Sequence, residues 1–218
     1  MAFKGWPGEA FDFYADLEEN NNRTWWLAHR DVYDRAVSEP FDELIEAVSA
    51  EFGPLRTFRP NRDVRFSHDK SPYKTAAAAT TDTDGVSNYV QISAEGLFVG
   101  VGMYHLASDQ LQRWREAVLD ERTGPAIAAI TAALAADGYD LAAAESLKTA
   151  PRGWDKEHPR IELGRLKGLV MAKPFPRAKW QSTPKALDRI VEVWRAGAPM
   201  GAWLDTNVGR STLPRERR

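Results

Sequence analysis

Basic side chains gather in one short part of this chain, and Arg and Lys are the residues that bind anions. The segment from Arg56 to Lys74, called the basic segment below, reads RTFRPNRDVRFSHDKSPYK. It holds six Arg or Lys and two Asp, whereas residues 1–55 hold four Arg or Lys and twelve Asp or Glu. Because like charges repel unless a partner offsets them, this pattern indicates that the segment holds an anionic group.

The chemistry of these side chains points to phosphate or carboxylate as the anion. Arg offers a planar fork that makes two parallel hydrogen bonds, and Lys offers a compact positive charge. We therefore expect a pocket for a small anionic ligand, with Tyr73 and Trp25 as apolar walls and Arg152 or His158 at the rim. The predicted ligand-binding residues are Arg62, Arg65, Lys70, Tyr73, Lys74, Trp25 and Arg152.

The sequence does not decide whether a reaction accompanies binding. In an enzyme, the cations would stabilise developing negative charge, and His68 or His29 would carry protons near neutral pH. Hydrolysis or group transfer on a phosphorylated metabolite is the corresponding hypothesis. The sequence has no G-x-S-x-G, G-x-G-x-x-G or G-x-x-x-x-G-K-[ST] motif, so no nucleophile or nucleotide loop is indicated.

Two other interpretations of the basic segment stay open. It could serve an interaction module that binds nucleic acid or protein through cations and exposed Trp rings, although the net charge of −2 disfavours nucleic acid. It could also be purely structural, with its Arg residues paired to acidic residues of the N-terminal helices. The acidic partners expected in that case are Asp31, Asp34 or Glu43.

Two further clusters have candidate chemistry. Trp25, Trp26, His29 and Tyr33 recur at helical spacing, which suits either ring stacking on a ligand or, as we favour, a core face. Residues 148–159 (KTAPRGWDKEHP) contain three possible metal ligands but lack the spacing of a metal motif. We expect that loop to be ordered around its Trp, with no metal and no cofactor.

Hydrophobic patterning predicts which elements position these residues. Residues 8–53 read as helices: the first over Gly8–Glu19, the next from an N-cap at Asn22, and a helix that Pro40 either starts or interrupts. Residues 57–104 read as strands, beginning with an irregular strand over Thr57–Phe66 that Val64 and Phe66 would anchor. Gly100 and Gly102 share a strand face, which indicates close approach by another group.

The remaining residues read as helical over 108–137 and mixed over 141–208. Ser108 is the expected N-cap of a helix, Pro174–Pro176 a break, and Leu187–Trp194 and Ala202–Val208 two separate helices. Residues 209–218 form a basic tail that we expect to fray. The pattern predicts an α+β fold, with an antiparallel sheet, helices mainly on one face, and one domain over residues 1–218.

Composition limits the class of protein and its compartment. With 218 residues, 43% apolar and 28% charged, the chain has the composition of a globular protein. It has no Cys, so disulfides and thiolate chemistry are excluded and a reducing compartment is expected. No apolar run approaches the roughly 20 residues of a membrane span, and MAFKGWPGEAF lacks a signal-peptide core. We expect a cytoplasmic protein; its oligomeric state does not follow from the sequence.

Several stretches together resemble the bacterial domain-of-unknown-function family 2461. They are NNNRTWWLAHRDVYDRAVSEPF, RDVRFSHDKSPYKT, YVQISAEGLFVGVGMY, LKTAPRGWDKEHPRIELGRLKGLV and PMGAWLDTNVG, in the family's order. The resemblance implies a single α+β domain and names no chemistry, and its basic motif maps onto Arg62, Arg65, Lys70, Tyr73 and Lys74. Residues 76–79 are Ala where relatives often carry a polar residue, so a ligand contact there does not carry over.

Overall fold

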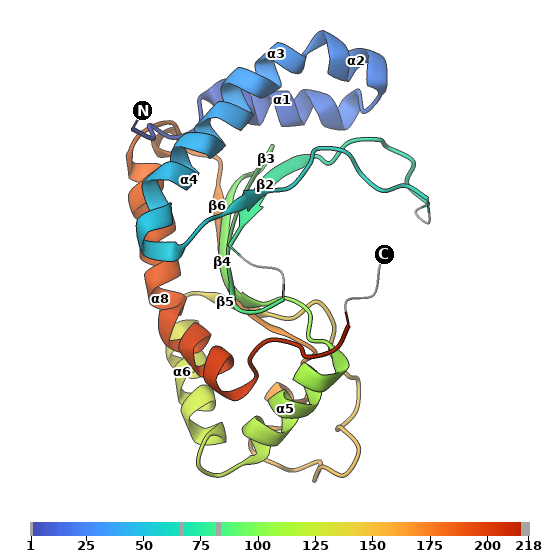
Figure 1. Cartoon of the computed structure of the whole chain (residues 1–218), viewed down its shortest axis with the longest axis vertical. Coiled ribbons are helices and arrows are strands. Elements are labelled where there is room, and N and C mark those ends of the chain that lie inside the picture. The colour runs from blue at the N-terminus through green and yellow to red at the C-terminus, as the bar shows by residue number, and fades with distance from the viewer. Residues whose placement is uncertain (1, 66–67, 82–83, 215–218) are drawn as a thin grey trace. The chain divides into compact units, whose positions relative to one another are not determined.

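The computed structural model describes residues 2–65, 68–81 and 84–214, and it has an α+β fold (Figure 1). The helices are α1 Gly8–Glu19, α2 Arg23–Ala28, α3 Arg30–Tyr33, the π-helix η1 Asp34–Ser38, α4 Glu39–Phe52, α5 Ser108–Leu119, α6 Gly124–Ala136, α7 Ile161–Arg165, the 3₁₀ helix η2 Lys179–Ser182 and α8 Lys185–Asn207. The strands are β1 Arg56–Thr57, β2 Ala76–Thr80, β3 Ser87–Ser93, β4 Gly96–Met103, β5 Asp140–Ala142 and β6 Leu169–Pro176.

The six strands form one sheet in the order β1-β2-β3-β4-β6-β5. β1 pairs antiparallel with β2, and β2 with β3, where Ala78 lies opposite Gln91. β5 pairs antiparallel with β6, where Leu141 lies opposite Met171. The predicted α+β class with an antiparallel sheet is therefore confirmed.

The chain contacts divide into two compact units. Unit 1 comprises residues 1–81, 89–99 and 174–192, and unit 2 comprises residues 82–88, 100–173 and 193–218. The strands β3, β4 and β6 each contribute residues to both units. The buried side chains of unit 1 include Phe11, Leu17, Phe41, Leu44, Ile92 and Leu97, and those of unit 2 include Met103, Trp114, Ile127, Trp194 and Leu204.

Local signals explain several of the helix boundaries. Asn22 caps α2, because its side-chain oxygen accepts a hydrogen bond from the Trp25 amide at 3.0 Å. Pro40 lies in the first turn of α4, so it starts this helix and does not interrupt it. Gly53 then ends α4 with a φ of +81°, a conformation that favours Gly.

Close backbone approach is confirmed at one of the paired glycines of β4. A Cβ added at Gly102 would lie 2.1 Å from the carbonyl oxygen of Leu169, and its φ is +143°. Only Gly fits there, because any side chain would meet the neighbouring backbone.

Four sequence expectations were wrong in detail. The residue that caps α5 is Ala107, because Gln110 accepts from its amide at 3.0 Å and Ser108 already has helical geometry. The strand β6 continues through Pro174–Pro176, at which we expected a break. The two expected C-terminal helices are one helix, α8, which contains Pro199. Residues 210–212 of the tail are bonded to α5 through Asp109 and Arg113, where fraying was expected, and residues 215–218 of the expected tail lie outside the described residues.

The expected strand over Thr57–Phe66 is also wrong. Only Arg56–Thr57 forms a strand, and an isolated bridge between Asn61 and Tyr73 follows it. Val64 is partly exposed, and Phe66 lies outside the described residues. Within the part of the chain that the structure describes, no helix has the length and apolar character of a membrane span.

Candidate functional site

The basic segment forms a two-stranded arm that leaves the edge of the sheet and returns to it. Beyond β1, the Phe58 amide donates to the Ala78 carbonyl at 2.9 Å. Further out, the Arg62 amide donates to the Pro72 carbonyl at 2.8 Å, and the Lys74 amide to the Pro60 carbonyl at 2.9 Å. In Figure 1 the arm runs outward beneath α2. These bonds set how far out along the arm each basic residue lies.

Helix α2 and the turn before it hold the arm through a ring stack and an amide clamp. The Asn21 side chain donates to the Tyr73 carbonyl at 2.9 Å and accepts from the Tyr73 amide at 3.1 Å. The Tyr73 ring stacks on Trp26, with ring centroids 4.2 Å apart and planes at 9°. Because Tyr73 is 7% exposed, most of its ring surface supports the arm and little of it faces solvent.

Two of the predicted ligand-binding cations, Arg62 and Lys70, are both bonded within the outer part of the arm. Arg62 forms an ion pair with Asp69, and the neighbouring Lys70 donates from Nζ to the Val64 carbonyl at 2.9 Å. This bond brings the Lys70 ammonium beside the chain that carries Arg65. The outer part of the arm thus carries three of the predicted cations, Arg62, Arg65 and Lys70, called the tip cluster below.

Arg65 is held by a local turn motif. Its amide donates to Asp63 Oδ1 at 3.2 Å, and its Nη2 donates to Asp63 Oδ2 at 2.7 Å. These bonds from the Arg65 side chain and amide lower the Asp63 pKa to about 2. In unit 2, Arg122 binds Asp120 through the same pair of contacts, so the motif is a general Asp-x-Arg turn.

The fourth predicted cation, Lys74, lies at the base of the arm, apart from the tip cluster. Its Nζ donates to the Arg59 carbonyl at 3.0 Å and lies 5.2 Å from the centroid of the Phe58 ring. Burial, and then repulsion from Arg59, lowers the Lys74 pKa. Lys74 lies four positions after Lys70 in the sequence, and an extended chain over four positions spans about 13 Å.

Charges within the basic segment do not balance. It has six positive and two negative side chains, which leaves four positive charges, and its two Asp each hold one Arg. Hydrogen bonds from Ser71 also lower the Asp69 pKa, so both Asp are ionised at neutral pH. Asp34, one of the acidic partners that a structural role would use, pairs with Arg30 at 2.8 Å.

The aromatic stripe is largely a core face, as we favoured. Trp26 and Tyr33 are buried and pack against Phe13, with ring centroids 5.6 and 5.8 Å away. Trp25 and His29 form their own stack at 4.0 Å, and His29 Nδ1 lies 2.8 Å from the Trp25 carbonyl oxygen. The ring that stacks on the basic segment is that of Trp26. We predicted Trp25 as an apolar wall of the ligand pocket, and in the structure its ring stacks on His29.

The remaining predicted residues lie elsewhere. His68 is exposed on the outer part of the arm. Arg152 belongs to unit 2, in an exposed loop ordered around Trp154, whose ring would lie 2.5 Å from a Cβ at Gly164. Among the described residues, no group of three or more His, Asp or Glu side chains is placed to hold a metal ion.

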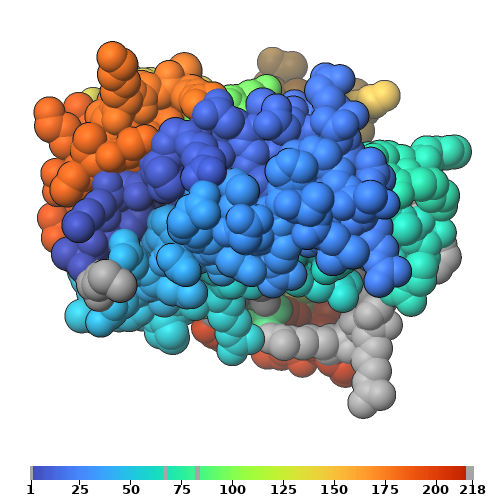
Figure 2. Space-filling model, turned by 90° about the horizontal axis from the view of Figure 1, so that it is seen from above, coloured from blue at the N-terminus to red at the C-terminus, as the bar shows by residue number. Residues whose placement is uncertain are grey.

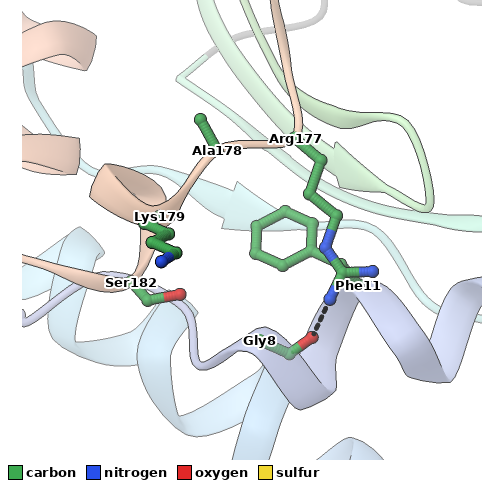
Figure 3. Close-up of a pocket in the computed structure, with 6 residues that line it drawn as sticks. All are labelled: Gly8, Phe11, Arg177, Ala178, Lys179 and Ser182. Carbon is green, nitrogen blue, oxygen red and sulfur yellow. Dashed lines mark hydrogen bonds between the residues drawn. The ribbon is translucent and has the colours of Figure 1, made fainter.

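A cavity of about 410 Å³ in unit 1 was not foreseen from the sequence (Figure 3). It is lined by Gly8, Phe11, Arg177, Ala178, Lys179 and Ser182. The available signal was the pair of cations at Arg177 and Lys179, two residues apart where β6 ends. This pair of cations could not indicate that Gly8 and Phe11, near the start of the chain, form the opposite wall of the cavity.

The sequence was compared with models of protein families. A family model described as a conserved hypothetical protein (DUF2461) matches residues 9–203 of the 218-residue chain. The matched region includes the whole basic segment and all residues of the tip cluster. No curated protein matches the sequence significantly.

Proposed function

This chain belongs to the DUF2461 family of conserved hypothetical proteins, and we propose that it binds a small anionic ligand through the basic segment. The ligand carries a phosphate or carboxylate group, which the tip cluster of Arg62, Arg65 and Lys70 binds. Lys74 supplies a further positive charge at the base of the arm. The protein acts in the cytoplasm, in agreement with a sequence that contains no Cys.

The observation that carries this proposal is the excess of positive charge at the tip. Three cations there share two carboxylates, those of Asp63 and Asp69, and Lys70 is bonded to a backbone carbonyl. Exposed ion pairs contribute at most about 1 kcal/mol, so an incoming anion can replace these Asp at small cost. A phosphate offers Arg two parallel charge-assisted hydrogen bonds, as the Asp carboxylate does.

We further propose that the protein catalyses a reaction of the bound ligand. The tip cluster would stabilise developing negative charge on a transferred or hydrolysed phosphoryl group. His68 lies on the same outer part of the arm and is the proton carrier in this scheme. His29 is the weaker choice, because its ring stacks on Trp25 and one ring nitrogen contacts a carbonyl oxygen.

A ligand screen with a matched pair of variants tests the proposal. Phosphorylated metabolites, nucleotides and carboxylates are added to the protein, and the unfolding temperature is measured. A ligand at 100 times its Kd stabilises the fold by about 2.7 kcal/mol, which raises the unfolding temperature by several degrees. Arg65→Ala should weaken binding about tenfold, since it removes a charged hydrogen-bonding group.

Arg122→Ala is the control, because Arg122 forms the same Asp-x-Arg turn in unit 2. It removes the same charge and should leave ligand binding unchanged. The proposal is wrong if no anion stabilises the protein, or if both variants weaken binding equally.

A second candidate is binding of single-stranded nucleic acid along the arm. It is favoured by the spread of the cations from base to tip and by Phe58, which is 40% exposed beside Lys74. A fluorescent oligonucleotide would then bind with an affinity that falls steeply as salt rises. Phe58→Ala should weaken oligonucleotide binding and leave the binding of a small phosphate unchanged.

A further inference from the structure

The cavity in unit 1 has walls from two distant parts of the chain (Figure 3). Gly8 and Phe11 come from the start of α1, and Arg177, Ala178, Lys179 and Ser182 come from the end of β6 and from η2. Figure 2 shows these two parts side by side, with the N-terminal residues in dark blue and residues 174–192 in orange. The cavity therefore depends on how these two stretches are joined.

The two stretches are joined by backbone bonds and close packing. The Trp6 amide donates to the Gln181 carbonyl at 3.0 Å. Gly5 has a φ of +86°, and a Cβ there would lie 2.4 Å from the same carbonyl oxygen. The Gln181 side chain is buried and donates to the carbonyls of Phe175 and Pro176 at 3.0 and 3.1 Å. These bonds and contacts join the two walls of the cavity.

Positive charge predominates in the lining. Arg177 Nη1 pairs with Asp12 at 2.7 Å, its Nη2 donates to the Gly8 carbonyl at 3.2 Å, and its guanidinium lies 5.5 Å from the Phe11 ring centroid. Lys179 is exposed and forms no ion pair with any residue that the structure describes. In Figure 3 the Ser182 hydroxyl points into the space between Ser182 and the Phe11 ring, and the Lys179 ammonium lies close to Ser182 on the same side of that space.

We propose that this cavity binds a compact anion, a phosphate or carboxylate group, between Lys179, Arg177 and the Ser182 hydroxyl. None of the six lining residues is acidic, so the lining does not suit a cation. Phe11 is 1% exposed, so the lining offers too little apolar surface to bind a large apolar ligand. The site lies on other elements than the basic segment, so this inference goes beyond the proposed function and stands without it.

Asp12 gives the proposal a test with two opposite outcomes. Its carboxylate competes with the anion for Arg177, and both side chains of this ion pair are well exposed, at 61% and 43%. Asp12→Asn should therefore free Arg177 and tighten anion binding several-fold. Lys179→Ala should weaken binding about tenfold, because it removes a charged partner of the anion. Both residues are exposed, so neither substitution threatens the fold.

The experiment titrates inorganic phosphate, and separately acetate, into the ¹⁵N-labelled protein at low salt. Amide shifts of Gly8, Lys179 and Ser182 report this site. Lys185→Ala is the matched control, because Lys185 is an exposed Lys of the same unit that does not line the cavity. It should leave the affinity unchanged, and so should Arg65→Ala, which tests the basic segment.

Three results would overturn the proposal. The first is that neither probe shifts these amides, and the second is that Lys185→Ala weakens binding as much as Lys179→Ala. The third is that Asp12→Asn fails to tighten binding. Because Arg65→Ala acts only on the basic segment, the two sites can fail separately.

Discussion

At the scale of the residue, the Asp-x-Arg turn makes a quantitative prediction about pKa. Hydrogen bonds from Arg65 and Arg122 lower the pKa of Asp63 and of Asp120 to about 2, against a usual value of 3.8. Because the folded-state pKa is lowered, each pair stabilises the fold above about pH 3.8 and loses this contribution as the pH falls through about 2. Carboxyl ¹³C shifts followed against pH would measure both groups.

Arg65→Ala should return the Asp63 pKa toward 3.8 and leave the Asp120 pKa near 2. The reciprocal variant, Arg122→Ala, should change only the Asp120 pKa. A shift of both carboxyls in either variant would show that the two turns are not independent.

Arg160 makes a second prediction at this scale, because it is one of the few buried charged residues of the fold, at 8% exposure. Its Nε donates to the Val118 carbonyl at 2.8 Å and its Nη2 to the Leu119 carbonyl at 3.1 Å, so it caps the end of α5. Arg160→Met leaves both carbonyls without this donor and should cost about 2–4 kcal/mol in urea unfolding.

Arg122→Ala is again a suitable control, because the Arg122 side chain is 88% exposed. It should change the free energy of unfolding by no more than about 0.5 kcal/mol. Equal effects of Arg160→Met and Arg122→Ala would contradict the capping role.

At the scale of the element, the arm depends on one side chain of the turn before α2. Asn21 supplies both bonds that an adjacent strand would offer to Tyr73. Asn21→Ala should cost about 1–2 kcal/mol and speed hydrogen exchange of the Tyr73 amide. Asn20→Ala removes only an exposed bond to the Asp16 carbonyl and should do neither. Unchanged exchange at Tyr73 in Asn21→Ala would mean that the ring stack alone holds the arm.

Elements with local signals were predictable from the sequence. The bounds of α1 match the expected Gly8–Glu19, because apolar spacing and turn residues set them. The arm was read as a strand because its cations alternate loosely with apolar residues. Its ladder instead holds Pro60 and Pro72, which accept hydrogen bonds but have no amide to donate.

Contacts between residues that are far apart in the sequence could not be predicted from the sequence. The clamp joins residues 52 positions apart, and Arg160 and its carbonyl partners are about 40 positions apart. The cavity at Arg177 joins residues 169 positions apart. No periodicity or spacing encodes such pairs, whereas the ion pairs of the basic segment are local and concern charges already visible in the sequence.

At the scale of the whole molecule, the sequence predicts one domain, and the chain contacts form two units. Each unit is built from three separate stretches of chain, and β3, β4 and β6 contribute to both. If β3, β4 and β6 unfolded in one unit, the same strands would be disrupted in the other unit as well. We therefore expect the two units to unfold together, in one cooperative transition.

Native-state hydrogen exchange tests this prediction with variants from each unit. Asn21→Ala destabilises unit 1, and it should lower the protection of the slowest amides of both units by the same free energy. Arg160→Met destabilises unit 2 and should have the reciprocal effect on amides such as those of Val90 and Ile92. If each variant lowers protection only in its own unit, the units are separate cooperative domains. If each variant lowers the protection free energy equally in both units, the two units form one cooperative domain. The reason is that an amide that exchanges only by global unfolding reports the stability of the whole region that unfolds with it.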